Sequence, residues 1–179
     1  NCHDALTGFY NRRCFDAKLA KTDKPENLPL SVIFADLNAL KMTNDIFGHS
    51  AGDELIKKAA EILLQSCRQT DIISRVGGDE FVVMLPQTGP TDAREVYARI
   101  KAGFADARVE AIKCSISLGL DTKINADQSL DVIIANAENA MYKDKTMNHK
   151  SVNKDIIRTI IGTLHTRNPL EKLHSESVA

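Results

Sequence analysis

Asp36, Asp79 and Glu80 lie where this sequence predicts the ends of β-strands. Asp36 ends an apolar run that begins at Leu30, and Asp79 and Glu80 lie between two further apolar runs. Carboxylates held close together repel one another unless a cation lies among them, and oxygen ligands suit Mg²⁺ or Mn²⁺. If these strands are neighbours, the sequence predicts a metal site of the kind that nucleotide triphosphates and two-metal nucleotidyl transfer use.

The two adjacent acids follow Gly77 and Gly78 at the predicted tip of a β-hairpin. Glycine is favoured in tight hairpin turns because it adopts positive φ angles. In the alternative interpretation the two acids are ordinary solvated turn residues, which is a common arrangement. A further acid, Asp36, at the end of another predicted strand favours the metal site.

The composition limits the fold and the classes of partner. A chain of 179 residues with 43% hydrophobic content can bury one full core. Its net charge of -1 offers no basic field for a long nucleic acid, and it has no Walker A loop. No apolar stretch reaches the roughly 20 residues that cross a bilayer, so we expect no direct membrane contact. We expect a cytoplasmic piece of a longer protein, whose upstream part can be membrane-anchored.

The four cysteines, Cys2, Cys14, Cys67 and Cys114, are widely separated. They show neither a CxxC motif nor another spacing typical of metal ligands. We therefore expect four reduced and mostly buried thiols.

Apolar residues at helical spacing predict helices, and continuous or alternating apolar runs predict strands. Strands that alternate with helices but include a hairpin indicate an α+β fold, with a mixed central sheet flanked by helices. Asp36 and the hairpin tip are then expected on neighbouring central strands. The predicted helices are 12–21, 40–47, one from Ser50 to about Cys67, 91–104, 130–145 and one from Asp155 onward, and the predicted strands are 30–35, 71–76, 81–85 and 112–118.

Several polar residues near helix ends have a structural interpretation. Ser50 followed by Asp53 matches a helix-capping pattern. Thr91 is expected to cap the helix that follows it in the chain. Lys143 and Lys145, in the predicted last turn of another helix, are typical of pairing with the helix dipole.

The chain resembles the GGDEF family, the diguanylate cyclases, over residues 4 to about 152. Arg75-x-Gly77-Gly78-Asp79-Glu80-Phe81 contains the signature that names the family. The motifs around it also agree: Asp4-x-Leu6-Thr7-Gly8-x-x-Asn11-Arg12-Arg13, Asp36 with Lys41, Asn44-Asp45-x-x-Gly48-His49-x-x-Gly52-Asp53, Ser117-x-Gly119 and Ala137-Glu138-x-Ala140-Met141-Tyr142-x-x-Lys145.

The resemblance implies a palm-like fold, similar to nucleotidyl cyclases and polymerases. It also implies condensation of two GTP into cyclic di-GMP with release of two pyrophosphates. By matching position, Asp36 and Glu80 would hold Mg²⁺ or Mn²⁺. Asp79 would be a neighbour of the metal and a candidate base for the ribose 3′-hydroxyl.

The resemblance also assigns ligand-binding residues. Asn44 and Asp53 would recognise guanine, since a carboxylate can accept both N–H groups of its Watson–Crick edge and an amide can serve the remaining positions. The phosphates would be bound by Ala39, Leu40, Lys41 and Lys145.

A second ligand site and a dimer are implied as well. Arg68-Gln69-Thr70-Asp71 resembles the RxxD product-inhibition site of the family, and Arg99 falls where the family has a second arginine. The alternative for Arg68 and Asp71 is an ordinary surface ion pair. Each family subunit holds one GTP and the product is two-fold symmetric, so a homodimer with facing half-sites is implied.

The sequence departs from the family pattern at two places. Asn38 and Leu40 differ from the usual Asp-x-Asp-x-Phe-Lys after the first strand. Asn148 and His149 stand where Gly-Arg is usual, so we expect Asn148 to adopt a glycine's conformation. His149 removes a permanent cation from the phosphate site.

The resemblance places the GGDEF domain at residues 1–152, followed by a linker helix and the start of another domain at 153–179. Residues 164–175 resemble the opening of an HD-GYP phosphodiesterase, with His174 at its first metal-binding histidine. An alternative function is therefore a catalytically weak or inactive module that binds GTP or cyclic di-GMP and regulates the adjoining phosphodiesterase.

Overall fold

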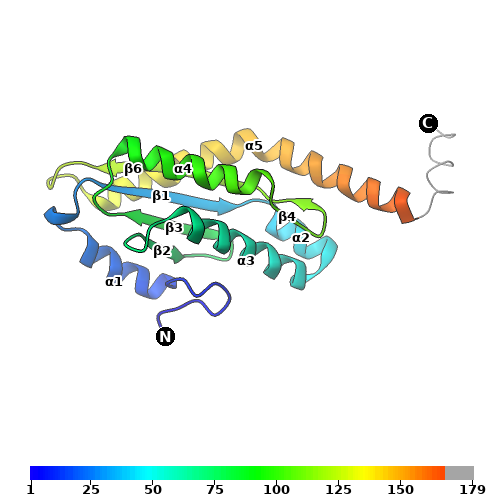
Figure 1. Cartoon of the computed structure of the whole chain (residues 1–179), viewed down its shortest axis with the longest axis horizontal. Helices are drawn as coiled ribbons and strands as arrows, with labels where there is room; N and C mark the ends of the chain where they lie inside the picture. The colour runs from blue at the N-terminus through cyan, green and yellow to red at the C-terminus, as the bar shows by residue number, and fades with distance from the viewer. Residues whose placement is uncertain (168–179) are drawn as a thin grey trace.

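The computed structural model describes residues 1–167, except the side chains of 149–153, 155, 156 and 165–167. A four-stranded sheet with helices on both faces forms its body, and a short hairpin lies beside it (Figure 1). The elements are α1 (Arg12–Thr22), the 3₁₀ helix η1 (Pro25–Asn27), β1 (Leu30–Leu37), α2 (Leu40–Phe47), α3 (His49–Ser66), β2 (Ile72–Arg75), β3 (Glu80–Leu85), α4 (Pro90–Ala105), β4 (Arg108–Val109), β5 (Ile112–Lys113), β6 (Ile116–Lys123) and α5 (Leu130–Arg167).

The sheet has the order β2-β3-β1-β6, and each of its pairings is antiparallel. The predicted α+β fold is confirmed, but the prediction of a mixed sheet is wrong. The chain crosses from β1 to β2 through two helices, and β3 then inserts between these two strands. Each strand therefore has only antiparallel neighbours.

Strand β1 forms the centre of the core. All eight of its residues are buried, because it has a strand on each side and helices over both faces. Ile33, Ala35 and Leu37 pack with apolar residues of α3 and α4. Val32 and Phe34 point to the other face and pack with α1 and α5. The continuous apolar run in the sequence is thus that of a strand covered on both faces.

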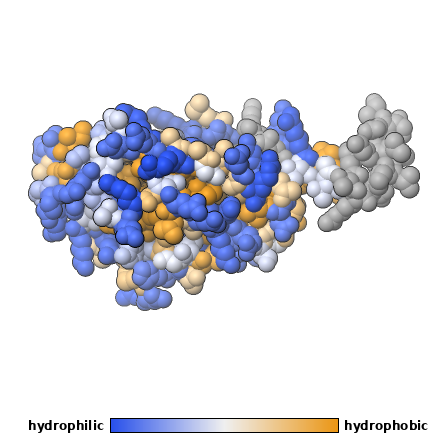
Figure 2. Space-filling view, viewed as in Figure 1, coloured by the Kyte–Doolittle hydropathy of each residue, from blue (hydrophilic) through white to orange (hydrophobic). Residues whose placement is uncertain are grey.

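The viewed surface is mostly hydrophilic, as expected when most apolar side chains are buried. Figure 2 shows hydrophilic residues over most of the viewed face, with smaller hydrophobic areas near its middle. Within the described residues, no helix is both long and apolar enough to span a membrane.

The helix starts differ from the predicted caps. Asn11 does cap α1, since its side chain accepts a hydrogen bond from the Cys14 N–H. By contrast, α3 begins at His49 after Gly48, and α4 begins at Pro90 after Gly89, without a side-chain cap on either helix. The predicted capping roles of Ser50 with Asp53 and of Thr91 are therefore wrong, because the cap positions, Gly48 and Gly89, lie two residues earlier in the chain.

The predicted strand 112–118 is interrupted. Ile112 and Lys113 pair with β4 in a tight hairpin, whereas β6 begins at Ile116. Glu110 and Ala111 form the hairpin turn with φ angles of 52° and 69°. Non-glycine residues in the left-handed region leave no clear turn signal in the sequence.

Helix α5 runs without a break from Leu130 to Arg167, and in Figure 1 it continues past the sheet. The prediction of one helix ending at 145 and another starting near 155 is wrong, because no glycine or proline lies between these positions. Asn148 is helical, so its predicted glycine-like conformation is wrong too. The domain boundary at 152 stays a prediction. His174 lies outside the described residues, as does the side chain of His149.

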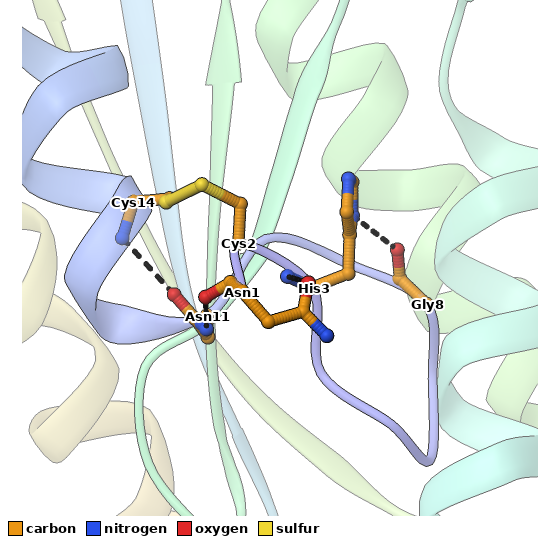
Figure 3. Close-up of a disulfide and its surroundings, with 6 residues drawn as sticks. All are labelled: Asn1, Cys2, His3, Gly8, Asn11 and Cys14. Carbon is orange, nitrogen blue, oxygen red and sulfur yellow. Dashed lines mark hydrogen bonds between the residues drawn. A yellow bond between two sulfur atoms is a disulfide. The ribbon is translucent and has the colours of Figure 1, made fainter.

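A disulfide joins Cys2 to Cys14, with the two Cα atoms 5.3 Å apart (Figure 3). The prediction of four reduced cysteines is wrong for this pair and holds for Cys67 and Cys114, which are free. Cys2 reaches Cys14 because its carbonyl accepts a hydrogen bond of 2.9 Å from the Asn11 N–H, at the start of α1. A contact of this kind between a loop and a helix gives no recognisable cysteine spacing.

The packing of α5 on β6 depends on Gly119. A Cβ atom at this position would collide with the backbone of Ala137 and Met141 on α5. We predict that Gly119→Ala lowers the free energy of unfolding by at least about 2 kcal/mol, measured by urea denaturation. Gly89→Ala is the matched control, since an added Cβ there meets only Pro29 at 3.7 Å. Equal stability of the two variants would contradict this packing.

Candidate active site

Asp36 and Glu80 lie directly opposite each other on neighbouring strands. They are partners in the antiparallel register of β1 and β3. The pairing continues one step further, where the Leu37 N–H donates a 2.8 Å hydrogen bond to the Asp79 carbonyl. The predicted proximity of Asp36 to the hairpin tip is therefore confirmed.

The turn between β2 and β3 has four residues, 76–79, so that Asp79 ends the turn and Glu80 begins β3. The N–H groups of Val76 and Gly77 donate to the Glu80 carbonyl at 2.9 and 3.4 Å. Neither Gly77 nor Gly78 has a positive φ angle, so the predicted reason for these glycines is wrong. The longer turn reverses the chain without one. A Cβ at Gly77 would lie 3.1 Å from Glu80 Oε1, whereas one at Gly78 would meet open space.

Arg75 and Asp4 hold this turn, a role that the motifs alone did not reveal. The guanidinium of Arg75 donates to the Gly78 carbonyl at 2.8 Å through Nη2, and to Asp4 at 3.0 and 3.1 Å through Nη1. Burial raises the pKa of Asp4, but hydrogen bonds from Thr7 and the pairing with Arg75 outweigh it and hold that pKa below its usual value. The N-terminal segment is thereby linked to the turn.

Asp36 is buried and close to other charges. Burial raises its pKa to about 6; the nearby Asp79 and Glu80 charges act in the same direction, and a hydrogen bond from Lys145 opposes them. The Lys145 ammonium lies 2.9 Å from Asp36 Oδ2, whereas Oδ1 is buried and has no partner in the described part of the chain. Burial lowers the pKa of Lys145, but its bond to Asp36 outweighs this and raises it.

The pKa of Glu80 is also raised, for similar reasons. Burial, then the charges of Asp79 and Glu138, raise its pKa, while Lys145 and Arg12 act in the opposite direction. The site thus holds more negative charge than its cations balance.

These observations fit a divalent cation between Asp36 and Glu80. An unpartnered buried carboxylate oxygen and crowded negative charge are what such an ion would stabilise. Among residues 1–148 and the other described side chains, no three His, Cys, Asp or Glu side chains form a metal-binding group. Asp36 and Glu80 would therefore hold an ion mainly as a pair, with Asp79 nearby.

Asp144 fixes the part of α5 that carries Lys145. Its Oδ2 accepts hydrogen bonds from the Leu118 N–H at 2.9 Å and from the Lys101 ammonium at 2.6 Å. Its Oδ1 accepts a bond of 3.0 Å from Asn148. These contacts attach α5 to β6 and α4, next to the strand that bears Asp36. Neither Asp144 nor Lys101 belongs to a sequence motif that would have indicated this role.

The predicted guanine-binding residues lie where α2 meets α3. The Asn44 side chain packs so closely on Gly52 that a Cβ there would collide with Asn44 Oδ1. This oxygen is buried without a hydrogen-bond partner in the described structure. Asp53, next to Gly52 in the first turn of α3, is exposed. Asp53 is thus open to a polar ligand group, whereas the Asn44 oxygen is covered in this structure.

The predicted phosphate-binding backbone lies at the start of α2. Ala39 adopts a left-handed conformation with φ of 64° and directly precedes Leu40, the first residue of the helix. Lys41 follows and is exposed. The first turn of a helix favours anions because its N–H groups point out of the helix. Lys145, the remaining predicted phosphate ligand, instead contacts Asp36.

Arg68, Asp71 and Arg99 lie together around the end of α3. Asp71 accepts hydrogen bonds from the backbone N–H of Arg68 at 2.7 Å and from its guanidinium at 3.2 Å. Arg68 also donates to Thr88 Oγ1, and Arg99 donates to the carbonyl of Ser66. Arg68 and Asp71 thus form an ion pair that also contacts Thr88, and their role in product binding stays a prediction.

The raised pKa of Asp36 gives a stability prediction. The folded protein retains this proton up to about pH 6, whereas the unfolded chain releases it near 3.8. Stability therefore falls as pH rises between these values, by on the order of 2–3 kcal/mol. In metal-free protein, urea denaturation from pH 4 to 7 should show this decline, and Asp36→Asn should show a clearly smaller one, because only the raised pKa of Glu80 then contributes. Asp131→Asn, an exposed control, should retain it; an unchanged decline in Asp36→Asn would contradict the burial effect.

Sequence comparison finds related proteins in bacteria. The family profile "Diguanylate cyclase, GGDEF domain" matches residues 1–151. Response regulator PleD of Caulobacter vibrioides is 30% identical over 158 residues, which are 83% of this chain and 35% of PleD. Diguanylate cyclase DgcM of Escherichia coli K12 is 30% identical over 148 residues, 80% of this chain and 36% of DgcM. The chain thus spans about a third of the length of these curated relatives.

Solved structures of GGDEF domains have a similar fold. The isolated GGDEF domain of TpbB (YfiN) from Pseudomonas aeruginosa has a TM-score of 0.73 and 29% identity, covering 81% of this chain and 89% of that one. The GGDEF domain of DgcB from Caulobacter crescentus, in complex with c-di-GMP, has a TM-score of 0.73, covering 82% of this chain and 89% of that one. Its identity of 21% supports the fold alone. Taken with the family profile and the placement of the signature residues, the chain belongs to the GGDEF diguanylate cyclase domain family.

Proposed function

We propose that this domain is a diguanylate cyclase, which condenses two GTP molecules into cyclic di-GMP and releases two pyrophosphates. The observation that carries the proposal is the cross-strand pair of Asp36 and Glu80, with an unpartnered buried oxygen on Asp36. Family membership supports the same reaction. DgcM, a relative of this chain, bears the name of this activity.

Asp36 and Glu80 would hold Mg²⁺ or Mn²⁺ at this pair. When bound, the metal supplies Lewis-acid stabilisation of phosphate oxygens and lowers the pKa of an attacking hydroxyl. Asp79, beside the pair, is the candidate base that receives the proton of the ribose 3′-hydroxyl. Its position in the turn is fixed by the bond between its carbonyl and Leu37.

Asn44 and Asp53 would recognise guanine. Asn44 contributes an acceptor oxygen that has no partner in the described structure, and Asp53 contributes an exposed carboxylate. Adenine would leave Asp53 unpaired at a cost of roughly 1–3 kcal/mol. The first turn of α2, from Ala39 to Lys41, would bind phosphate.

Lys145 would move from Asp36 to the triphosphate when metal binds, because the ion then compensates the Asp36 charge. The side chain of Lys145 is half-buried, so it can reach solvent from its present position. This exchange of one cation for another joins metal binding to phosphate binding.

Product inhibition would use Arg68, Asp71 and Arg99. An arginine can bind the O6 and N7 atoms of guanine with two parallel hydrogen bonds. The structure of DgcB with c-di-GMP is compatible with product binding in the family. Because the product has two-fold symmetry and each domain would hold one GTP, turnover would need a homodimer, which can be transient.

The second candidate is a domain that binds GTP or cyclic di-GMP without turnover and regulates an adjoining HD-GYP-like phosphodiesterase. The observation that favours it is the contact between Lys145 and Asp36, which occupies both a predicted phosphate ligand and a predicted metal ligand. Binding of nucleotide without formation of cyclic di-GMP would establish this function.

The cyclase proposal is tested by incubating the protein with GTP and Mg²⁺ and measuring cyclic di-GMP by chromatography. We predict product from the wild type, and a loss of at least about 100-fold in rate for Glu80→Gln with nearly unchanged GTP binding. The exposed Glu95→Gln on α4 is the control. A wild type that forms no product, even as a forced dimer cleared of bound nucleotide, would exclude the cyclase; equal rates for Glu80→Gln would remove its metal role.

Product inhibition has its own test. Arg68→Ala should raise the concentration of cyclic di-GMP that halves the cyclase rate by about tenfold or more, because a charged bidentate hydrogen bond is lost. Arg99→Ala should act in the same direction, whereas the exposed Arg94→Ala should not. Inhibition that is unchanged in both Arg68→Ala and Arg99→Ala would show that these arginines have only a structural role.

A further inference from the structure

The disulfide between Cys2 and Cys14 lies at the surface, in a segment that contacts the candidate active site through hydrogen bonds. Cys2 is exposed and Cys14 is half-buried at the start of α1. Figure 3 shows the bond beside Asn11, whose backbone N–H and side chain hold the carbonyls of Cys2 and Asn1, both at 2.9 Å. A dissolved thiol can therefore reach the bond without unfolding the core.

The segment closed by this disulfide covers the free edge of β2. Tyr10 bridges to Ser74: its N–H donates to the Ile73 carbonyl at 3.3 Å, and its own carbonyl accepts from the Arg75 N–H at 2.8 Å. His3 bridges to Tyr10 and stacks on its ring at 5.1 Å. The N-terminal segment thus forms a small extension of the sheet.

The same segment contributes to holding the catalytic turn. Asp4 binds the guanidinium of Arg75, which in turn donates to the Gly78 carbonyl. Gly78 directly precedes Asp79 and Glu80. A continuous set of contacts therefore leads from the disulfide, through Asp4 and Arg75, to the turn at 76–79, which ends in Asp79 and directly precedes Glu80.

We propose that Cys2 and Cys14 form a thiol–disulfide exchange site, and that opening this bond loosens the N-terminal segment and, through Asp4 and Arg75, the turn at 76–79. The reactant is a dissolved small-molecule dithiol. Only the consequence for GTP turnover rests on the proposed cyclase function. The predicted loosening of the N-terminal segment and of the turn does not depend on that function.

The proposed reaction is a thiol–disulfide exchange in two steps. A thiolate of the dithiol attacks the exposed Cys2 sulfur, and the Cys14 sulfur leaves as a thiolate and takes up a proton. The second thiolate of the dithiol then attacks the mixed disulfide and releases Cys2. The protein disulfide gains two electrons and two protons, and the dithiol becomes a disulfide. Cys14 is a suitable leaving group, because it lies in the first turn of α1, where the helix N-terminus stabilises negative charge.

The remaining cysteines are poor competitors for this chemistry. Burial, with a contribution from Asp71, raises the pKa of Cys67 to about 12. Burial raises the pKa of Cys114 to about 11. Thiols of this kind hold little thiolate at neutral pH and react slowly. The exchange chemistry is therefore confined to Cys2 and Cys14.

The test measures amide hydrogen exchange by mass spectrometry on the 179-residue chain, oxidised and after reduction with dithiothreitol. Reduction should raise the number of thiols titrated after denaturation in guanidinium from two to four, because denaturation exposes Cys67 and Cys114 as well. It should also accelerate exchange in peptides 4–11 and 75–80 by roughly 10- to 100-fold, the factor expected when a cross-link of this loop length is removed. Peptides of the central strand β1 should be unchanged. With GTP and Mg²⁺, the reduced protein should lose cyclase rate.

Three variants separate this effect from general destabilisation. Cys2→Ser and Cys14→Ser should exchange rapidly in both peptides without reductant, and should not respond to it. Cys67→Ser, which retains the disulfide, should respond like the wild type. Four titratable thiols in the oxidised wild type, or unchanged exchange at 75–80 after reduction, would overturn the proposal. A protein without cyclase activity in either state would contradict the proposed function alone, because exchange reports on the turn directly.

Discussion

The antiparallel pairing of β1 with β3 is the constraint on which the rest of the site depends. Its register sets Asp36 opposite Glu80, and its last backbone bond fixes Asp79 against Leu37. A shift of one residue would turn Glu80 to the other face of the sheet and Asp36 away from it. The register is maintained because β1 is buried on both faces, so that any shift would also disrupt two apolar clusters.

The same burial that fixes the register makes the site electrostatically unfavourable without a bound cation. Asp36 loses solvent and faces neighbouring acids, and Lys145 satisfies only one of its oxygens. The fold tolerates this arrangement because Asp144 and Gly119 attach α5 firmly to β6 and so keep Lys145 within reach. Under the proposed function, the lysine would balance part of this charge until a divalent ion and a triphosphate took its place.

The sequence predicts those parts of the fold and of the site that depend on a local pattern of residues. The apolar run from Leu30 identifies β1 and its terminal acid, and the motifs locate the hairpin and the α2–α3 junction. It does not predict contacts between distant segments, such as Lys145 with Asp36 or Cys2 with Cys14, because neither pair has a local spacing that marks it. The glycines at 77 and 78 show a related limit: a longer turn removes the need for positive φ, and only the structure reveals its length.

The proposed function requires that Asp36 exchange its contact with the Lys145 ammonium for a divalent cation shared with Glu80. The most direct measurement is an NMR titration of the Asp36 carboxyl carbon, with and without Mg²⁺ and a non-hydrolysable GTP analogue. The account predicts a pKa of about 6 in the free protein and a fall below the ordinary aspartate value when metal and nucleotide bind. A pKa that stays at about 6 with the nucleotide bound would contradict it.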